Sequence, residues 1–199
     1  MIDTRTTRER IRSEAAALFS EYGFNGTSMA ELASAVGITK SSLYHHFPSK
    51  QALLSEIIEL TVKRVTPLVQ EVADSELSAA KRLRRALVLH TVEAIRDQHA
   101  IACFIEEGRY LAPDFMATHV ANRDAYEQVF RRLFEEGIGS GEFVEQDVGI
   151  AVKAVLGMCN SVVRWYRPGG AYSPEEIAHE FAEFAVRGAS MPSAFGGDR

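Results

Sequence analysis

Cysteine is scarce in this chain, so a disulfide framework is not expected. Cys103 and Cys159 are its only cysteines among 199 residues, and both lie in apolar stretches. Small secreted domains that depend on disulfides carry cysteine far more densely. The first ten residues are polar and charged, which does not fit a secretory signal. Both absences favour a protein of the reducing cytoplasm.

The sequence also lacks the patterns of a membrane, metal or cofactor protein. No apolar run approaches the ~18 residues that a membrane span needs, so we expect no membrane partner. His45 and His46 are adjacent, and adjacent helical residues point in different directions, so we expect no metal site there. Gly137, Gly139 and Gly141 mimic a phosphate-binding loop, but no predicted strand precedes them. We therefore expect no cofactor and interpret these glycines as a helix end.

Acidic residues are missing from one stretch of an otherwise acidic chain. The net charge of −5 argues against a protein that binds phosphates over its whole surface. Residues 1–50 hold six Lys or Arg and five Asp or Glu, a net of +1, so the rest of the chain carries −6. Between Glu31 and Glu56 there is no acid, but there are two lysines and two histidines. This window predicts a surface that a DNA duplex can approach.

The first fifty residues carry the pattern of three helices. Ser28 and Glu31 are spaced as a capping box, Gly37 allows a sharp turn, and Thr39 can cap the next helix. Two short helices joined by a turn that contains glycine are typical of a helix-turn-helix. A longer helix precedes them, and its apolar stripe consists of Ile11, Ala15, Leu18, Phe19 and Tyr22. The sequence thus predicts a helix-turn-helix at residues 28–47.

The third of these helices offers little to a core beyond Leu43 and Phe47. Its cationic and hydroxyl side chains suit phosphates, and residues at the start of a recognition helix reach base edges. A merely solvated polar face is the alternative. We expect base contacts from Thr39, Lys40, Ser41 and Ser42. We expect contacts to the DNA backbone from Thr27, Tyr44, His45 and Lys50, and Ser28 and His46 complete the expected set.

The rest of the chain reads as further helices with short breaks. The sequence therefore predicts an all-α protein, with a three-helix DNA-binding domain over residues 1–49 and a larger ligand-binding and dimerisation domain over 50–199. Residues 147–166 are apolar nearly all round, which indicates burial on several sides. Ser173, Pro174 and Glu176 are the start signals of a last helix that we expect to end at Gly188. Two such helices suit a four-helix bundle between two subunits, with packing inside one chain as the alternative.

A ligand pocket is predicted from aromatic and apolar residues with a few polar ones among them. Ordinary core packing is the alternative for each member. The set consists of Phe104, Arg109, Phe115, Met116, His119, Tyr126, Met158 and Trp165.

The segment at residues 28–47, SMAELASAVGITKSSLYHHF, resembles the helix-turn-helix signature of TetR/AcrR transcriptional regulators. The match covers residues 5–64 without a gap and includes the flanking Pro48-Ser49-Lys50. The resemblance implies a repressor that binds a palindromic operator as a dimer and is released by a small ligand.

A second segment is similar to part of those family members that regulate fatty-acid or sterol breakdown and respond to acyl-CoA thioesters. It runs from Arg164 to Gly170 and continues with Ser173–Glu176. The resemblance implies a hydrophobic or acyl-CoA-like effector. Arg109, Arg123 and Arg164 are candidate anion partners for it, and surface salt bridges are their alternative role.

Two other functions remain as alternatives. A helical enzyme would draw on Cys103, Glu106, Glu107 and His119, but no nucleophile–base pair or metal spacing links them, so we do not expect an enzyme. A protein-interaction module would use the first fifty residues to bind a partner protein instead of DNA.

Overall fold

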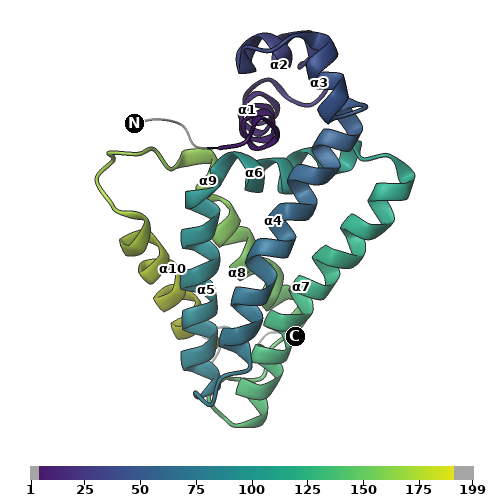
Figure 1. The fold of residues 1–199 in the computed structure, drawn as a ribbon. Coiled ribbons are helices and arrows are strands. Elements are labelled where there is room, and N and C mark those ends of the chain that lie inside the picture. Colours follow the sequence, from purple (N-terminus) through teal and green to yellow (C-terminus); the bar gives the residue numbers. More distant parts are fainter. Residues whose placement is uncertain (1–4, 191–199) are drawn as a thin grey trace. The chain divides into compact units, whose positions relative to one another are not determined.

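The computed structural model describes residues 5–190 (Figure 1). These residues form helices joined by turns and loops, and none of them forms a strand. Helix occupies 79% of these described residues, which confirms the all-α prediction. The first helices are α1 (Thr7–Tyr22), α2 (Met29–Val36), α3 (Lys40–His46), α4 (Lys50–Ala73) and α5 (Ala79–Arg96). Next come α6 (Gln98–Ala102), the π-helical η1 (Cys103–Glu107) and the 3₁₀ turn η2 (Gly108–Tyr110). The last are α7 (Pro113–Gly139), α8 (Val148–Asn160), α9 (Val162–Trp165) and α10 (Pro174–Ser190).

These helices pack into two compact units that do not follow chain order. Unit 1 holds the described residues up to Lys63 together with Asp97–Asn122. Unit 2 holds Arg64–Arg96 and the described residues from Arg123 onward. The predicted division after residue 49 follows sequence order and stays a prediction, whereas the units group residues by packing. Segment 97–122 therefore folds with the N-terminal helices.

Local signals fix the helix-turn-helix of unit 1. The Glu31 N–H donates to Ser28 Oγ at 3.2 Å and the Ser28 N–H donates to Glu31 Oε2 at 2.7 Å, so the predicted capping box is confirmed. Thr39 accepts the Ser42 N–H at 3.1 Å and caps α3. Gly37 has a φ of 74° in the left-handed region, which glycine adopts without the strain of a side chain. These contacts set where α2 ends and α3 begins.

The core of unit 1 is formed largely by the predicted apolar positions. Tyr22, in contrast, was expected on the inward stripe and is 60% exposed at the last residue of α1. The fully or nearly fully buried side chains include Ile11, Ala15, Phe19, Leu32, Leu43, Phe47, Leu53 and Leu54. α3 adds little to this core beyond Leu43, as expected.

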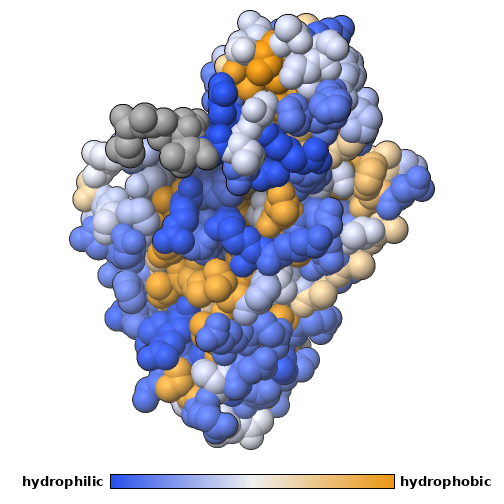
Figure 2. Space-filling model, viewed as in Figure 1, coloured by the Kyte–Doolittle hydropathy of each residue, from blue (hydrophilic) through white to orange (hydrophobic). Residues whose placement is uncertain are grey.

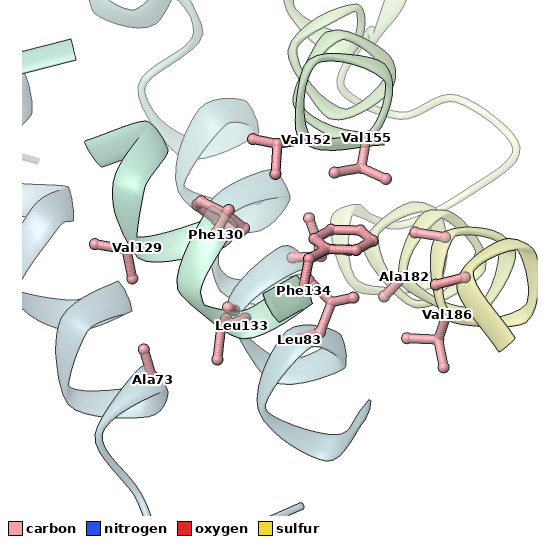
Figure 3. Close-up of a cluster of buried hydrophobic side chains, with 14 of the residues drawn as sticks. Ala73, Leu83, Val129, Phe130, Leu133, Phe134, Val152, Val155, Ala182 and Val186 are labelled. Atoms are coloured by element: carbon pink, nitrogen blue, oxygen red, sulfur yellow. The ribbon is translucent and has the colours of Figure 1, made fainter. Parts of the chain in front are cut away.

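Aromatic and branched side chains form the core of unit 2 (Figure 3). Phe130 and Phe134 of α7 lie close to Val152 of α8, and Ala182 of α10 faces the same cluster. Burying such a side chain contributes about 1.5–3 kcal/mol. The face of the protein in Figure 2 is mostly hydrophilic, with apolar residues in separate patches.

The glycine cluster at 137–141 does end α7, whereas the predicted helix limit at Gly188 is wrong. Two helices also contain a residue that disfavours helix. α4 continues through Pro67, α7 continues through Gly137 to Gly139, and α10 passes Gly188 and ends at Ser190. A glycine costs a helix only about 1 kcal/mol, which tertiary packing offsets. At Gly137 the ring of Phe143 occupies the space that a side chain would need. The glycine there serves close packing instead of ending the helix.

Candidate nucleic-acid interface

The outward face of α3 is exposed, and that expectation is confirmed. Ser42 and His46 are half-buried, while Leu43 and Phe47 point into the core. The exposed residues are Thr39, Lys40, Ser41, Tyr44 and His45. Lys40 Nζ lies 5.9 Å from the centroid of the Tyr44 ring, so a cation and a phenol share this surface. DNA contact by these residues stays a prediction.

Arginines of α1 secure the end of α3, a role that the sequence interpretation missed. Arg8 Nη1 donates to the His46 carbonyl at 2.7 Å, and its guanidinium lies 4.2 Å from the centroid of the Phe47 ring. Arg8 and Arg12 both pair with Glu56, and hydrogen bonds from Arg8 are the main cause that lowers the pKa of that carboxyl. A cation at a helix C-terminus also matches the helix dipole.

Arg10 does the same for α2. Its Nη2 donates to the Val36 carbonyl at 2.7 Å, at the last residue of that helix. Several of the arginines in the first fifty residues are therefore engaged in contacts within the protein. The sequence shows where the arginines are, but which loop or helix end each one reaches depends on the tertiary fold.

Two residues expected to touch phosphates are bonded within unit 1. Lys50 Nζ donates to the carbonyl oxygens of Phe24, at 2.5 Å, and of Thr27, at 2.7 Å. Burial lowers the pKa of Lys50. Thr27 is 3% exposed, and its hydroxyl donates to the Gly23 carbonyl at 3.1 Å. Phosphate contact by Lys50 and Thr27 stays a prediction, but their polar groups already have partners.

The predicted pocket residues are divided between the two units. In unit 1, the rings of Phe104 and His119 lie 5.0 Å apart, and Arg109 lies 4.9 Å from the centroid of the Tyr110 ring. Phe115 is 39% exposed. Met116 is also in unit 1 and packs beside its buried core.

Unit 2 holds the other three, Tyr126, Met158 and Trp165. Trp165 is 47% exposed and meets the Phe181 ring edge-on, with 6.2 Å between centroids. One pocket shared by all eight residues stays a prediction.

A buried polar chain in unit 2 includes one of these residues. His90 Nδ1 lies 2.7 Å from the Tyr126 hydroxyl, and His90 Nε2 lies 3.1 Å from Asn160 Oδ1. Because the amide oxygen only accepts, Nε2 carries the proton and Nδ1 accepts from the tyrosine. Burial lowers the pKa of His90 to about 4 and raises that of Tyr126. The three hydrogen-bonded side chains of Tyr126, His90 and Asn160 are therefore neutral at pH 7.

The candidate catalytic groups of the enzyme alternative lie in unit 1. Cys103 Sγ donates to the Ala16 carbonyl at 3.6 Å, and burial raises the pKa of the thiol to about 12, so it stays protonated. Glu107 is 6% exposed and accepts the Phe24 N–H. Among residues 5–190, no three His, Cys, Asp or Glu side chains gather as a metal site would require.

An exposed apolar face occurs where α8 and α10 meet in unit 2. Ile150 is 68% exposed and Phe184 73% exposed. Beside Phe184 lies a groove of about 260 Å³, and Met158 is the one predicted pocket residue in its lining. The expectation that no apolar run approaches the length of a membrane span is wrong, because Val148–Trp165 passes as one by length and composition alone, with 22% of it buried.

Both the N-terminal and the C-terminal parts of the chain match models of known protein families. Residues 11–57 match the model of bacterial regulatory proteins of the tetR family, and residues 76–189 match that of the tetracyclin repressor-like C-terminal domain. The HTH-type transcriptional repressor KstR2 of Rhodococcus jostii (strain RHA1) is 30% identical over 188 residues, 93% of this chain and 92% of its own.

Solved structures of similar fold include the TetR family regulator PfmR of Thermus thermophilus. It has a TM-score of 0.82 and 34% identity, and the match covers 89% of this chain and 97% of that one. AibR, solved in complex with isovaleryl coenzyme A and operator DNA, has a TM-score of 0.81 at 24% identity over 90% of this chain and 97% of its own. At that identity the likeness to AibR shows the fold alone.

Proposed function

The chain belongs to the TetR family of DNA-binding transcriptional regulators, and on that premise we propose that it is a dimeric repressor released from a palindromic operator by a small effector. The observation that carries the proposal is the exposed face of α3, which projects Lys40 and several hydroxyls from a capped helix. In the proposed complex, the start of α3 meets base edges in the major groove. Tyr44 meets the adjoining phosphates, and Lys40, which we also expect at base edges, supplies a charge that neutralises a phosphate.

Selection of binding sites from a random DNA library tests the operator. A two-fold repressor selects palindromes whose half-sites lie about one DNA turn (~34 Å) apart, or a multiple of it. Lys40→Ala then weakens binding to every sequence and lowers the slope of log Kd against log salt by about one per subunit. Lys81→Ala, an exposed lysine of unit 2, is the matched control and leaves both unchanged. Equal retention of random and selected DNA contradicts the proposed operator, and retention of neither favours a protein-interaction module.

Dimerisation through α8 and α10 is the second part of the proposal. Supporting it are the exposure of Ile150 and Phe184 and the apolar groove beside them, because an isologous interface needs a self-complementary apolar patch. We expect Phe184→Glu to give monomers in sedimentation equilibrium. Tyr22→Glu, which changes a similarly exposed aromatic residue in unit 1, leaves the dimer intact. A dimer that persists in Phe184→Glu contradicts this interface.

A membrane is the other occupant that the apolar segment 148–165 allows. Flotation with lipid vesicles decides the matter, and we expect the protein to stay unbound. Relatives that act on DNA support a cytoplasmic location for this chain as well.

The effector that we propose is a hydrophobic or acyl-CoA-like molecule. Support comes from the similarity of segment 164–176 to acyl-CoA-responsive regulators and from the ligand of AibR, a protein of the same fold. Isovaleryl coenzyme A, free coenzyme A and isovalerate form a matched probe set for thermal shift and operator release. A ligand that prefers one conformation raises the apparent Tm and changes operator affinity together. A Tm that none of the probes raises removes support for this effector class and leaves the DNA-binding proposal standing.

A further inference from the structure

Glu107 is a buried carboxylate that the DNA-binding surface does not use. It is the last residue of η1, the π-helical turn that directly follows α6. Its Oε2 accepts the backbone N–H of Phe24 at 2.8 Å, although the two residues are 83 positions apart. Single π-helical turns are rare and occur frequently at functional sites. A carboxylate withdrawn from water needs such hydrogen bonds, so loss of this contact is costly.

Lys50 binds the carbonyl group of the same residue, Phe24. Its Nζ donates to the Phe24 carbonyl at 2.5 Å and lies 4.3 Å from the centroid of the Phe24 ring. We call this arrangement, Glu107 on the Phe24 N–H and Lys50 on the Phe24 carbonyl, the Phe24 clamp. The ring itself is stacked on Tyr110 of η2, with centroids 5.9 Å apart. Both polar groups of one loop residue are thus bound by charged side chains.

The clamp acts on the entry to the helix-turn-helix. Lys50 also donates to the Thr27 carbonyl, and Thr27 immediately precedes Ser28, the N-cap of α2. The Thr27 hydroxyl ties the same loop back to Gly23. Because α2 packs on α3 within unit 1, the loop sets where the recognition helix is held.

We propose that Glu107 and Lys50 are positioning residues for DNA binding, which fix α2 and α3 through Phe24 and touch no DNA themselves. The inference rests on the proposed function. It adds a regulatory route, because Glu107 lies in the stretch that matches the C-terminal family model yet folds with the helix-turn-helix. A rearrangement of η1 would then reach α3 through one hydrogen bond, without a ligand near DNA.

The first experiment substitutes the carboxylate. Glu107→Ala removes the acceptor, so the Phe24 amide exchanges its hydrogen faster and operator affinity falls on the order of tenfold. The slope of log Kd against log salt stays that of the unmodified protein, because no phosphate contact is lost. Glu107→Gln keeps an acceptor oxygen and restores most of both. Glu106→Ala removes the same charge from the neighbouring residue and serves as the control, with unchanged exchange and affinity.

The second experiment separates positioning from phosphate contact at Lys50. Lys50→Met keeps the apolar stem and removes the donors, so affinity falls while the salt slope is retained. Lys40→Ala is the comparison, since it lowers the slope. A flatter slope in Lys50→Met overturns the positioning role of Lys50. Should Glu107→Ala fail to fold, Lys50→Met still carries the test.

The outcomes distinguish this inference from the proposed function. Faster Phe24 exchange with unchanged operator affinity in Glu107→Ala overturns the inference and leaves the repressor intact. An unmodified protein that selects no operator overturns the proposed function, and the exchange of Phe24 then still reports whether the clamp exists.

Discussion

Charged side chains bind backbone atoms inside both units, as Glu142 does for the Ala79 and Ala80 N–H groups of unit 2, but in unit 1 these contacts lie around the helix-turn-helix. In unit 1, charged side chains reach across the fold to backbone atoms, as Arg8, Arg10, Lys50 and Glu107 do. In unit 2, aromatic and branched side chains of α7, α8 and α10 fill the centre, and its buried polar chain around His90 is neutral. Large side chains are fully buried in both units, so the charged contacts of unit 1 do not replace a core but fix its loops and helix ends.

This difference separates binding from stability. A loop held by a few long-range hydrogen bonds can shift without unfolding its unit, which changes how α3 is presented. A core held by close packing tolerates no such shift, and the loss of one large side chain lowers the free energy of unfolding directly. We therefore expect substitutions at loop contacts in unit 1 to act mainly on DNA affinity, and core substitutions in unit 2 to act mainly on stability.

The largest effect is expected in the core of unit 2. Phe134 is 1% exposed, and Phe134→Ala leaves a cavity among α7, α8 and α10, which lowers the free energy of unfolding by about 3–5 kcal/mol. Urea titration followed by tryptophan fluorescence measures this, because Trp165 is the single tryptophan and lies in unit 2.

Phe115→Ala is the control for this substitution. Phe115 is 39% exposed in unit 1, and its loss is expected to change the unfolding of unit 2 little. Equal losses in the two variants would mean that the units unfold together, and the comparison between them would fail.

Sequence reasoning predicted the parts of this fold that local chemistry decides. The capping boxes at Ser28 and Ser173 each lie within four residues, so the pattern contains all the atoms that form them. The exposure of α3 followed from its shortage of apolar residues. The helix limit at Gly188 was wrong because packing of α10 overrides the local preference of a glycine.

Long-range partners were out of reach of the sequence. Lys50 was assigned to phosphate for its charge, and that contact stays a prediction, but the sequence did not show that its ammonium bonds to carbonyls 26 and 23 residues away. Glu107 was considered only as a catalytic group. Nothing local marks a carboxylate that accepts a loop N–H from the other end of the chain, and the fold has to bring the two together.

The second-largest effect concerns His90 and pH. Its folded-state pKa of about 4 lies below the ordinary value of 6.5, so the unfolded chain binds the proton more readily. The stabilising contribution is complete above pH 6.5, decreases as pH falls from 6.5 toward 4, and is lost below that range. The loss amounts to about 3 kcal/mol. Urea titrations of unit 2 at about pH 7 and about pH 5 measure the slope.

Two variants test this assignment. His90→Gln stays neutral and removes the slope between about pH 6.5 and about pH 5, whatever its absolute stability. His99→Gln, at an exposed histidine, keeps the slope. If stability depended on pH equally in the unmodified protein, His90→Gln and His99→Gln, then His90 would be solvated and would not be held neutral by burial in unit 2.

The smallest effect compares two equivalent caps, one in each unit. At Ser28 and at Ser173, the hydroxyl accepts the N–H of a glutamate three residues later at 3.2 Å. The carboxylate of that glutamate accepts the serine N–H at 2.7 Å. Ser28→Ala and Ser173→Ala should each cost about 1 kcal/mol of stability, since the chemistry removed is the same. Operator affinity should fall only in Ser28→Ala, because only that cap fixes the helix that precedes α3. If both variants weakened DNA binding equally, the position of α3 would depend on global stability and not on the loop contacts of unit 1.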